Sequence, residues 1–243
     1  MERRGEIGGS TSTGILKILA LVFMFCDHAG KMLLPGVQEM RVLGRVAFPL
    51  YCWCLVVGFH YTRSVPKYML RILLIGLISQ PLYMAALNHT WREPNIFLTL
   101  LIGLAALWAL REKRCGSHIW GPVIALALAV LLKCDYGWRG VLLIILLYAA
   151  RESRASLAAV MLAFCLYWGS SSTLVNDFFG LTLKPIMVTP ISDLLQPWMR
   201  LQGLAILSLP LMLIPLPEIR MPRWLGYALY PLHLVVLLLL EHL

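Results

Sequence analysis

The chain has 243 residues, of which 60% are hydrophobic and 14% charged, and its mean hydropathy is +0.78. A soluble domain would carry about 25% charged residues, so the composition excludes an ordinary soluble globular protein. The formal net charge of +9 is spread over short segments between apolar runs. This pattern is typical of the basic loops of a membrane protein and not of a nucleic-acid-binding surface. We therefore expect an all-α, polytopic protein in contact with the lipid bilayer, with no nucleic-acid partner.

Apolar runs that could cross a bilayer recur along the whole chain. We expect a short cytoplasmic N-terminal tail at 1–14, followed by a single transmembrane domain at 15–243. Because Lys17 interrupts the first apolar run, that run predicts a first transmembrane helix and not a signal peptide. The predicted spans are 15–34, 42–61, 67–87, 95–111, 118–133, 138–150, 155–172, 200–216 and 222–240. They make about nine helices, and 173–199 is either an interfacial or re-entrant piece or a tenth, broken span.

The basic residues predict an orientation and a cavity. Of the 21 Lys and Arg residues, 13 lie on the side of the N-terminus and 8 on the other, which places the N-terminus in the cytoplasm. Several of the eight gather with acidic residues, which favours a polar cavity that opens towards the outer face. The spans 118–133 and 138–150 are short and are joined by "CDYGWRG". This connection is expected to dip below the membrane surface, against protein or water.

The first span carries the candidate catalytic base. Lys17, Met24, His28 and Lys31 share one face of a helix at 100° per residue, and His28 lies about 16 Å beyond Lys17 along the axis. A cation near the cytoplasmic end and a titratable base deeper inside suit an anionic donor that enters from the cytoplasm. The alternative is that Lys17 snorkels to the interface and His28 only bonds within the bundle.

Acidic and basic residues crowd the first two spans. Asp27 lies on a different face of the helix from its neighbour His28. A carboxylate that orients His28 would therefore come from another part of the chain, and Asp135 is the candidate. Asp27 is expected to pair with Arg41 or Arg45, which share a face of "RVLGRVAFPLY" and flank Gly44, a residue that permits close helix approach. We predict that Arg41 forms the structural pair and that Arg45 faces the cavity. The alternative role of both arginines is substrate or phosphate binding.

Other polar residues lie near or inside predicted spans. Five of them are candidate binding residues, and for each the alternative is capping or helix-helix hydrogen bonding: Asn95, Tyr136, Gln202, Tyr230 and His233. Tyr230 and His233 are three apart and share a face. The six scattered cysteines lack the spacing of a zinc site, and we expect no metal centre.

The residues above match a known family pattern. The chain resembles the TraX family of bacterial membrane proteins, named for the conjugative-plasmid protein that acetylates the N-terminus of F-type pilin. Through this family it is similar to the wider transmembrane acyltransferases, including the family-3 O-acyltransferases. The resemblance covers most of the chain, in order, through "LKILALVFMFCDHAG", "RVLGRVAFPLYCWCLVVGFHYT", "KYMLRILLIGLISQP", "NIFLTLLIGL", "DYGWRGVLLIILLY", "RLQGLAILSLPLML" and "LYPLHL".

The resemblance implies an integral-membrane acetyltransferase of the bacterial inner membrane. The donor would be cytoplasmic acetyl-CoA and the acceptor the N-terminal amine of a pilin subunit. The acyltransferases carry an arginine and a histidine eleven apart in their first helix, and Lys17 and His28 stand at those positions here. Lysine lacks the bidentate fork by which arginine holds phosphate. Neutral His28 would serve as general base, or would itself be acetylated.

Three alternatives differ from this interpretation. The acceptor could be a glycan or another envelope molecule instead of a pilin. The chain could be a transporter, since intramembrane charges are also typical of transporters. It could also be a pilus assembly factor without catalysis, for which a His28 substitution would be harmless.

Overall fold

The fold is a bundle of α-helices with one small hairpin. The structure is a computed structural model and describes residues 6–175, 177–178, 181–182, 196–219 and 222–242. Its larger helices are α1 (Thr13–Met32), α2 (Gln38–Gly44), α3 (Ala47–Tyr61), α4 (Val65–Leu87), α5 (Ile96–Glu112), α6 (Ser117–Leu131), α7 (Gly137–Ala149), α8 (Arg154–Gly169) and α12 (Arg223–Glu241). The described residues also form short elements: η1 (Arg114–Gly116), η2 (Gly203–Leu207), α11 (Ser208–Leu213) and the antiparallel strands β1 (Asp177–Phe178) and β2 (Leu181–Thr182).

Among the described residues, four helical segments are long and apolar enough to cross a membrane. They are Thr13–Met32, Gln38–Tyr61, Val65–Leu87 and Arg114–Leu131. The all-helical architecture agrees with the expectation from the sequence, whereas the count of nine spans stays a prediction. Most of the ambiguous segment 173–199 lies outside the described residues.

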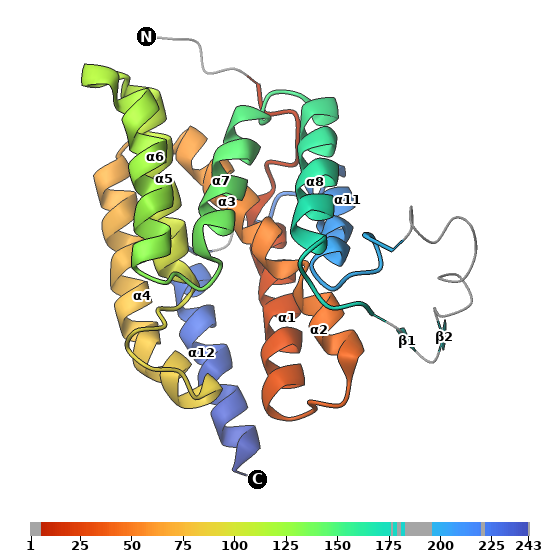
Figure 1. The fold of residues 1–243 in the computed structure, drawn as a ribbon. Helices are drawn as coiled ribbons and strands as arrows, with labels where there is room; N and C mark the ends of the chain where they lie inside the picture. Colours follow the sequence, from red (N-terminus) through yellow and green to blue (C-terminus); the bar gives the residue numbers. More distant parts are fainter. Residues whose placement is uncertain (1–5, 176, 179–180, 183–195, 220–221, 243) are drawn as a thin grey trace.

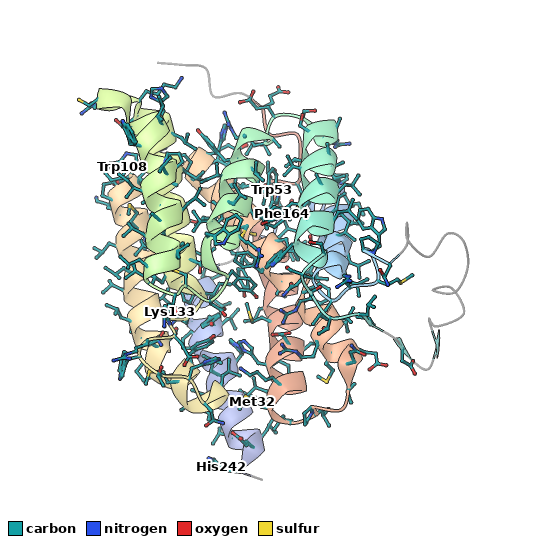
Figure 2. The ribbon with its side chains drawn as sticks, in the orientation of Figure 1. Met32, Trp53, Trp108, Lys133, Phe164 and His242 are labelled. Carbon is teal, nitrogen blue, oxygen red and sulfur yellow. The ribbon has the colours of Figure 1, made fainter. Side chains whose placement is uncertain are left out.

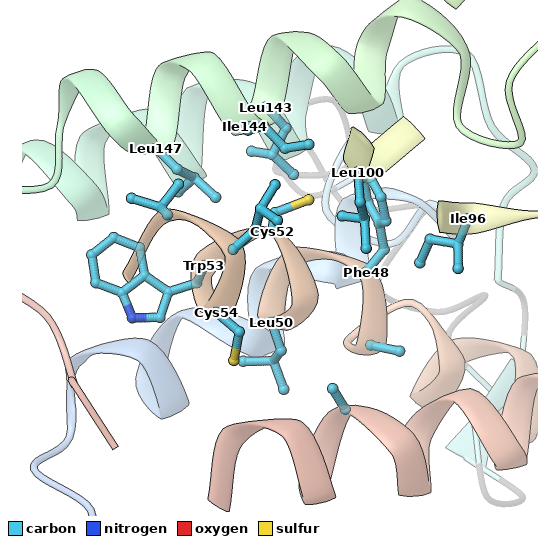
Figure 3. Close-up of a cluster of buried hydrophobic side chains, with 14 of the residues drawn as sticks. Phe48, Leu50, Cys52, Trp53, Cys54, Ile96, Leu100, Leu143, Ile144 and Leu147 are labelled. Carbon is cyan, nitrogen blue, oxygen red and sulfur yellow. The ribbon is translucent and has the colours of Figure 1, made fainter. Parts of the chain in front are cut away.

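The segment α2–α3 forms the centre of the bundle and α6 its outside. Within an 18-residue apolar stretch of each segment, 78% of the residues are buried in Gln38–Tyr61 and 11% in Arg114–Leu131. Figure 3 shows the α3 side chains Leu50 and Cys54 on one side of the helix and Cys52 turned towards Leu143 and Ile144 of α7. The outer helices expose large apolar side chains, such as Leu74, Leu77 and Ile78 of α4 and Ile119, Trp120 and Ile124 of α6. Such apolar faces suit lipid contact.

The connection between α6 and α7 lies part of the way along the bundle and not at one of its ends. Figure 1 shows the stretch that leads into α1 near one end of the molecule and the C-terminal end of α12 at the other. In Figure 2, Lys133 at this connection lies between Trp108 at the upper end and Met32 and His242 at the lower end. The polar residues that follow Lys133 are therefore held at mid-height of the molecule, beside α1 and α12.

Two segments differ from their sequence-based description. The predicted span 200–216 is η2 followed by the six-residue α11, because Pro210 fits only the first turn of a helix. The end of the segment predicted as a tail is packed: Gly8 N donates to the Arg151 carbonyl at 2.8 Å and Ser10 N to the Met212 carbonyl at 2.6 Å. The Trp53 indole donates to the Ser10 carbonyl at 2.9 Å, so this stretch enters the bundle before α1 begins.

Candidate active site

A polar pocket lies beside the C-terminal half of α1. Its volume is about 490 Å³, and α1, α2, α4, the α6–α7 connection and α12 contribute to its walls. We call it the His28 pocket. The charged residues that line it are Asp27, Lys31, Arg41, Arg45, Asp135 and Arg139. These residues come from three separate parts of the sequence, and together they make the pocket charged rather than apolar.

His28 is held by a second histidine at the wall of this pocket. Its Nδ1 lies 3.0 Å from Nε2 of His233 on α12, and the two rings stack with centroids 5.2 Å apart. Both residues are buried, with 5% of each exposed. His28 lines the pocket, whereas His233 is not among the lining residues and lies behind it. The two histidines are 205 positions apart, and no local pattern predicts that they pair.

Asp27 forms ion pairs with both neighbouring arginines. Its Oδ2 lies 3.3 Å from Arg41 Nη1, and its Oδ1 pairs with Arg45 Nη2. The Arg45 side chain is 9% exposed and that of Arg41 is 31% exposed. The predicted pairing of Asp27 with an arginine is confirmed. Arg45, which was expected to face the cavity, lines the His28 pocket, but it is also bound to Asp27 and is the more buried of the two arginines.

Gly44 permits this arrangement. A Cβ added at Gly44 would collide with the side chain of Asp27, so the close helix approach predicted at this glycine is confirmed. α1 and α2 therefore meet at the ion-pair cluster itself, and the cluster is enclosed by backbone on one side.

The α6–α7 connection contributes Asp135 and Tyr136 to the pocket. Asp135 is open to the pocket but is surrounded by protein, and this enclosure raises the pKa of its carboxyl from 3.8 to about 6. Tyr136 stacks on Phe48 of α3 with centroids 3.6 Å apart. No hydrogen bond between Asp135 and His28 occurs in the described part of the chain; the hydroxyl of Tyr83 on α4 interacts with Asp135 instead. The orienting partner of His28 in the structure is thus His233.

A chain of polar contacts that was not predicted from the sequence lies at the edge of the pocket. Lys31 Nζ lies 3.1 Å from His89 Nε2, and His89 Nδ1 lies 3.3 Å from a carboxylate oxygen of Glu93. The Tyr83 ring stacks on His89 with centroids 5.0 Å apart. The only local pattern that could have predicted it is the four-residue spacing of His89 and Glu93 in a polar loop.

Lys17 lies in a second pocket. This Lys17 pocket has a volume of about 340 Å³ and is formed by the N-terminal half of α1 with parts of α3, α4, α5 and α12. Tyr51, Tyr68 and Tyr227 line it together with apolar residues. Tyr230 lines both pockets, so this one side chain lies at their boundary. Lys17 thus lines a different pocket from His28 and Lys31.

The remaining candidates divide into one structural residue and one pocket residue. Asn95 caps α5, because its side chain accepts from Phe97 N at 3.0 Å and donates to the Gly76 carbonyl at 2.8 Å. It is not among the residues that line the His28 pocket or the Lys17 pocket. Gln202 lines the His28 pocket, and its backbone N–H donates to Ser172 Oγ at 3.1 Å.

Comparison with known proteins shows which family and which relatives the chain is similar to. The family model described as TraX protein matches residues 12–241. The probable fimbrial assembly protein FimC, serogroup H1, of Dichelobacter nodosus is 30% identical over 163 residues, which are 61% of this chain and 66% of that protein. Protein TraX of Escherichia coli strain K12 is 29% identical over 157 residues, which are 63% of this chain and 61% of that protein.

The chain spans about two thirds or less of the length of these two relatives. No solved structure matches it. Because the family match runs from the start of α1 to the end of α12, the chain belongs to the TraX family.

Proposed function

We propose that this protein is an integral-membrane acetyltransferase that moves the acetyl group of cytoplasmic acetyl-CoA to the N-terminal amine of a pilin subunit. The observation that carries the proposal is His28, an imidazole with one nitrogen engaged by His233, at the wall of a charged pocket. An imidazole in this position is suited to take a proton from an amine at neutral pH. The names of relatives, TraX and a probable fimbrial assembly protein, support a pilin as the acceptor.

The two pockets support the order of events. The Lys17 pocket offers one cation and largely apolar walls, which fit a thioester arm better than a nucleotide. The His28 pocket holds more cations than carboxylates, which favours the neutral, reactive form of the acceptor amine, and Asp135 can accept a hydrogen bond from that amine. In the proposed orientation the N-terminus is cytoplasmic, nine helices span the bacterial inner membrane, and the polar cavity opens outwards. The donor would then enter at Lys17 and the acceptor at His28, with Tyr230 between them.

The chemistry assigned to His28 is a proton transfer in two directions. Acetyl-CoA supplies the activated acyl group. His28 takes the proton that the amine loses as the C–N bond forms, and it returns this proton to the sulfur released when the C–S bond breaks. Arg41 and Arg45 hold Asp27 in place, and the more exposed Arg41 keeps donors for an anionic group of either substrate.

Acetyl transfer by the reconstituted protein tests this proposal. The purified protein in lipid vesicles is given acetyl-CoA and a peptide with the N-terminal sequence of a mature pilin from the same bacterium, and the peptide mass is followed. Loss of a general base lowers a rate by about 10²- to 10⁴-fold, so His28→Gln should acetylate at most about a hundredth as fast. His118→Gln is the matched control, because His118 is an exposed residue of α6 and lines neither pocket.

Two results would overturn the proposal. One is an undiminished rate for His28→Gln at wild-type abundance in the vesicles. The other is the absence of any mass increase with the wild-type protein, combined with normal pilus assembly by His28→Gln in cells. The second result would favour an assembly factor without catalysis.

A further inference from the structure

The contact between His28 and His233 restricts the protons that the two rings can carry. Their facing nitrogens, His28 Nδ1 and His233 Nε2, are 3.0 Å apart, so one nitrogen donates and the other accepts. In a neutral imidazole one nitrogen is a donor and the other an acceptor. The direction of this one hydrogen bond therefore fixes the tautomer of both rings, and with it whether the other nitrogen of His28, Nε2, carries a proton or a lone pair.

The surroundings of His233 decide which of the two rings donates the hydrogen bond. Its Nδ1 is buried and has no hydrogen-bond partner in good geometry among the described residues. The backbone of Leu229 and Tyr230, one turn earlier in α12, interacts with this ring. The backbone groups that a helix turns towards the residue three or four positions later are carbonyl oxygens, which are acceptors. A proton on Nδ1 is attracted by these oxygens, whereas a lone pair there would be repelled. The favoured tautomer of His233 thus carries its proton on Nδ1 and leaves Nε2 as an acceptor.

The consequence reaches the pocket through His28. If His233 Nε2 accepts, His28 Nδ1 carries a proton and donates it to His233. The other nitrogen of His28, Nε2, then holds the lone pair, and His28 is the member of the pair that lines the pocket. An Nε2 lone pair is what a general base needs, whereas an Nε2–H could not take a proton from the acceptor.

We propose that His233 is a positioning residue that holds His28 in the tautomer with a free Nε2 lone pair. The proposal rests on the acetyl transfer proposed above and assigns a task to a residue outside the pocket. When His28 takes the proton of the amine on Nε2, its Nδ1–H continues to donate to His233. The charge on His28 is thereby stabilised without a second proton transfer.

The packing of both rings supports a fixed geometry. The Tyr230 ring lies edge-on to His233 at 4.9 Å, and the Tyr83 ring lies edge-on to His28 at 6.4 Å. Both histidines and both tyrosines are buried. Neither imidazole has room to turn over freely, so the contact selects one tautomer and not an average of two.

Nitrogen NMR of the intact protein tests the tautomer directly. The protein is labelled with ¹⁵N-histidine, reconstituted in lipid, and measured at pH 8, where an unperturbed imidazole with a pKa near 6.5 is neutral. The signals of His28 are found by difference from His28→Gln. The expected result is a proton on Nδ1 and none on Nε2. In His233→Phe, which keeps a ring but removes the acceptor, this preference should be lost, and His233→Gln, which keeps an acceptor, should retain it.

Kinetics provide the second arm of the test. In the serine-protease triad, loss of the group that fixes the tautomer of the catalytic histidine lowers kcat by about 10⁴-fold, and we expect His233→Phe to lower kcat by at least about tenfold. The KM for acetyl-CoA should change little, because His233 lines neither pocket. His233→Gln should recover part of the rate, and His118→Phe should have the wild-type rate.

The outcomes separate this inference from the proposed function. A wild-type His28 with its proton on Nε2, or an unchanged tautomer in His233→Phe, overturns the positioning role even if acetyl transfer proceeds. The expected tautomer in a protein that transfers no acetyl group would support the contact and refute the function. A fall in KM and kcat together for His233→Gln would also contradict the positioning role.

Discussion

Replacement of Arg45 by alanine should destabilise this protein far more than replacement of Arg41. Both arginines pair with Asp27, but the Arg45 side chain is 9% exposed and that of Arg41 31%. Breaking a buried ion pair costs about 3–5 kcal/mol because a desolvated charge remains, whereas an exposed pair contributes about 0.2–1 kcal/mol. We therefore expect a loss of about 3 kcal/mol for Arg45→Ala and of about 1 kcal/mol for Arg41→Ala.

These free energies translate into a measurable difference in unfolding temperature. For a chain of this size, 1 kcal/mol corresponds to about 2–4 °C in Tm, which gives roughly 6–12 °C for Arg45→Ala and 2–4 °C for Arg41→Ala. The buried, free thiols of Cys52, Cys54 and Cys165 report unfolding to a thiol-reactive dye in detergent. A Cys115→Ser background removes the exposed thiol.

A double substitution separates charge burial from lost packing. Asp27→Asn removes both ion pairs and leaves Arg45 buried without a carboxylate. Adding Arg45→Met to that variant should restore part of the lost stability, because it removes the unpaired charge at similar volume. Equal unfolding temperatures for Arg41→Ala and Arg45→Ala, or no recovery in the double variant, would refute this reasoning.

Three further predictions follow from the structure. Asn95→Ala should lose about 1 kcal/mol of stability through the α5 cap, with unchanged acetyl transfer per folded molecule; a selective loss of activity would show a binding role. Because enclosure raises the pKa of Asp135 to about 6, the folded state binds more protons than the unfolded state between about pH 4 and pH 6. Its stability contribution therefore falls as pH rises through this window, and Asp135→Asn should flatten the fall of Tm; an identical profile would contradict the shift. Finally, Arg92→Cys should react with an impermeant thiol reagent in intact cells and Cys115 only after permeabilisation, and the reverse order would invert the predicted orientation.

The helix pattern of this protein could be predicted from its sequence. Apolar runs of limited length, ended by polar loops, placed α1 and α3 to α8 within a few residues of their observed bounds. Helical periodicity likewise predicted the common face of Lys17 and His28, and short spacing predicted the pairing of Asp27 with an arginine. All of these depend on residues close together in the chain, where geometry follows from the rise and turn of a single helix.

The organisation of the site was decided by tertiary structure. The partner of His28 comes from α12, the boundary residue Tyr230 belongs to both pockets, and Asp135 is enclosed by helices distant in sequence. Burial of Arg45 rather than Arg41 depends on how α2 turns against α1 at Gly44. Local periodicity predicts which face of a helix is apolar. It does not predict which other helix packs on that face or how deeply each residue is buried. Hydrogen bonds and the pKa of Asp135 depend on that depth and that neighbour, and only the packed bundle supplies both.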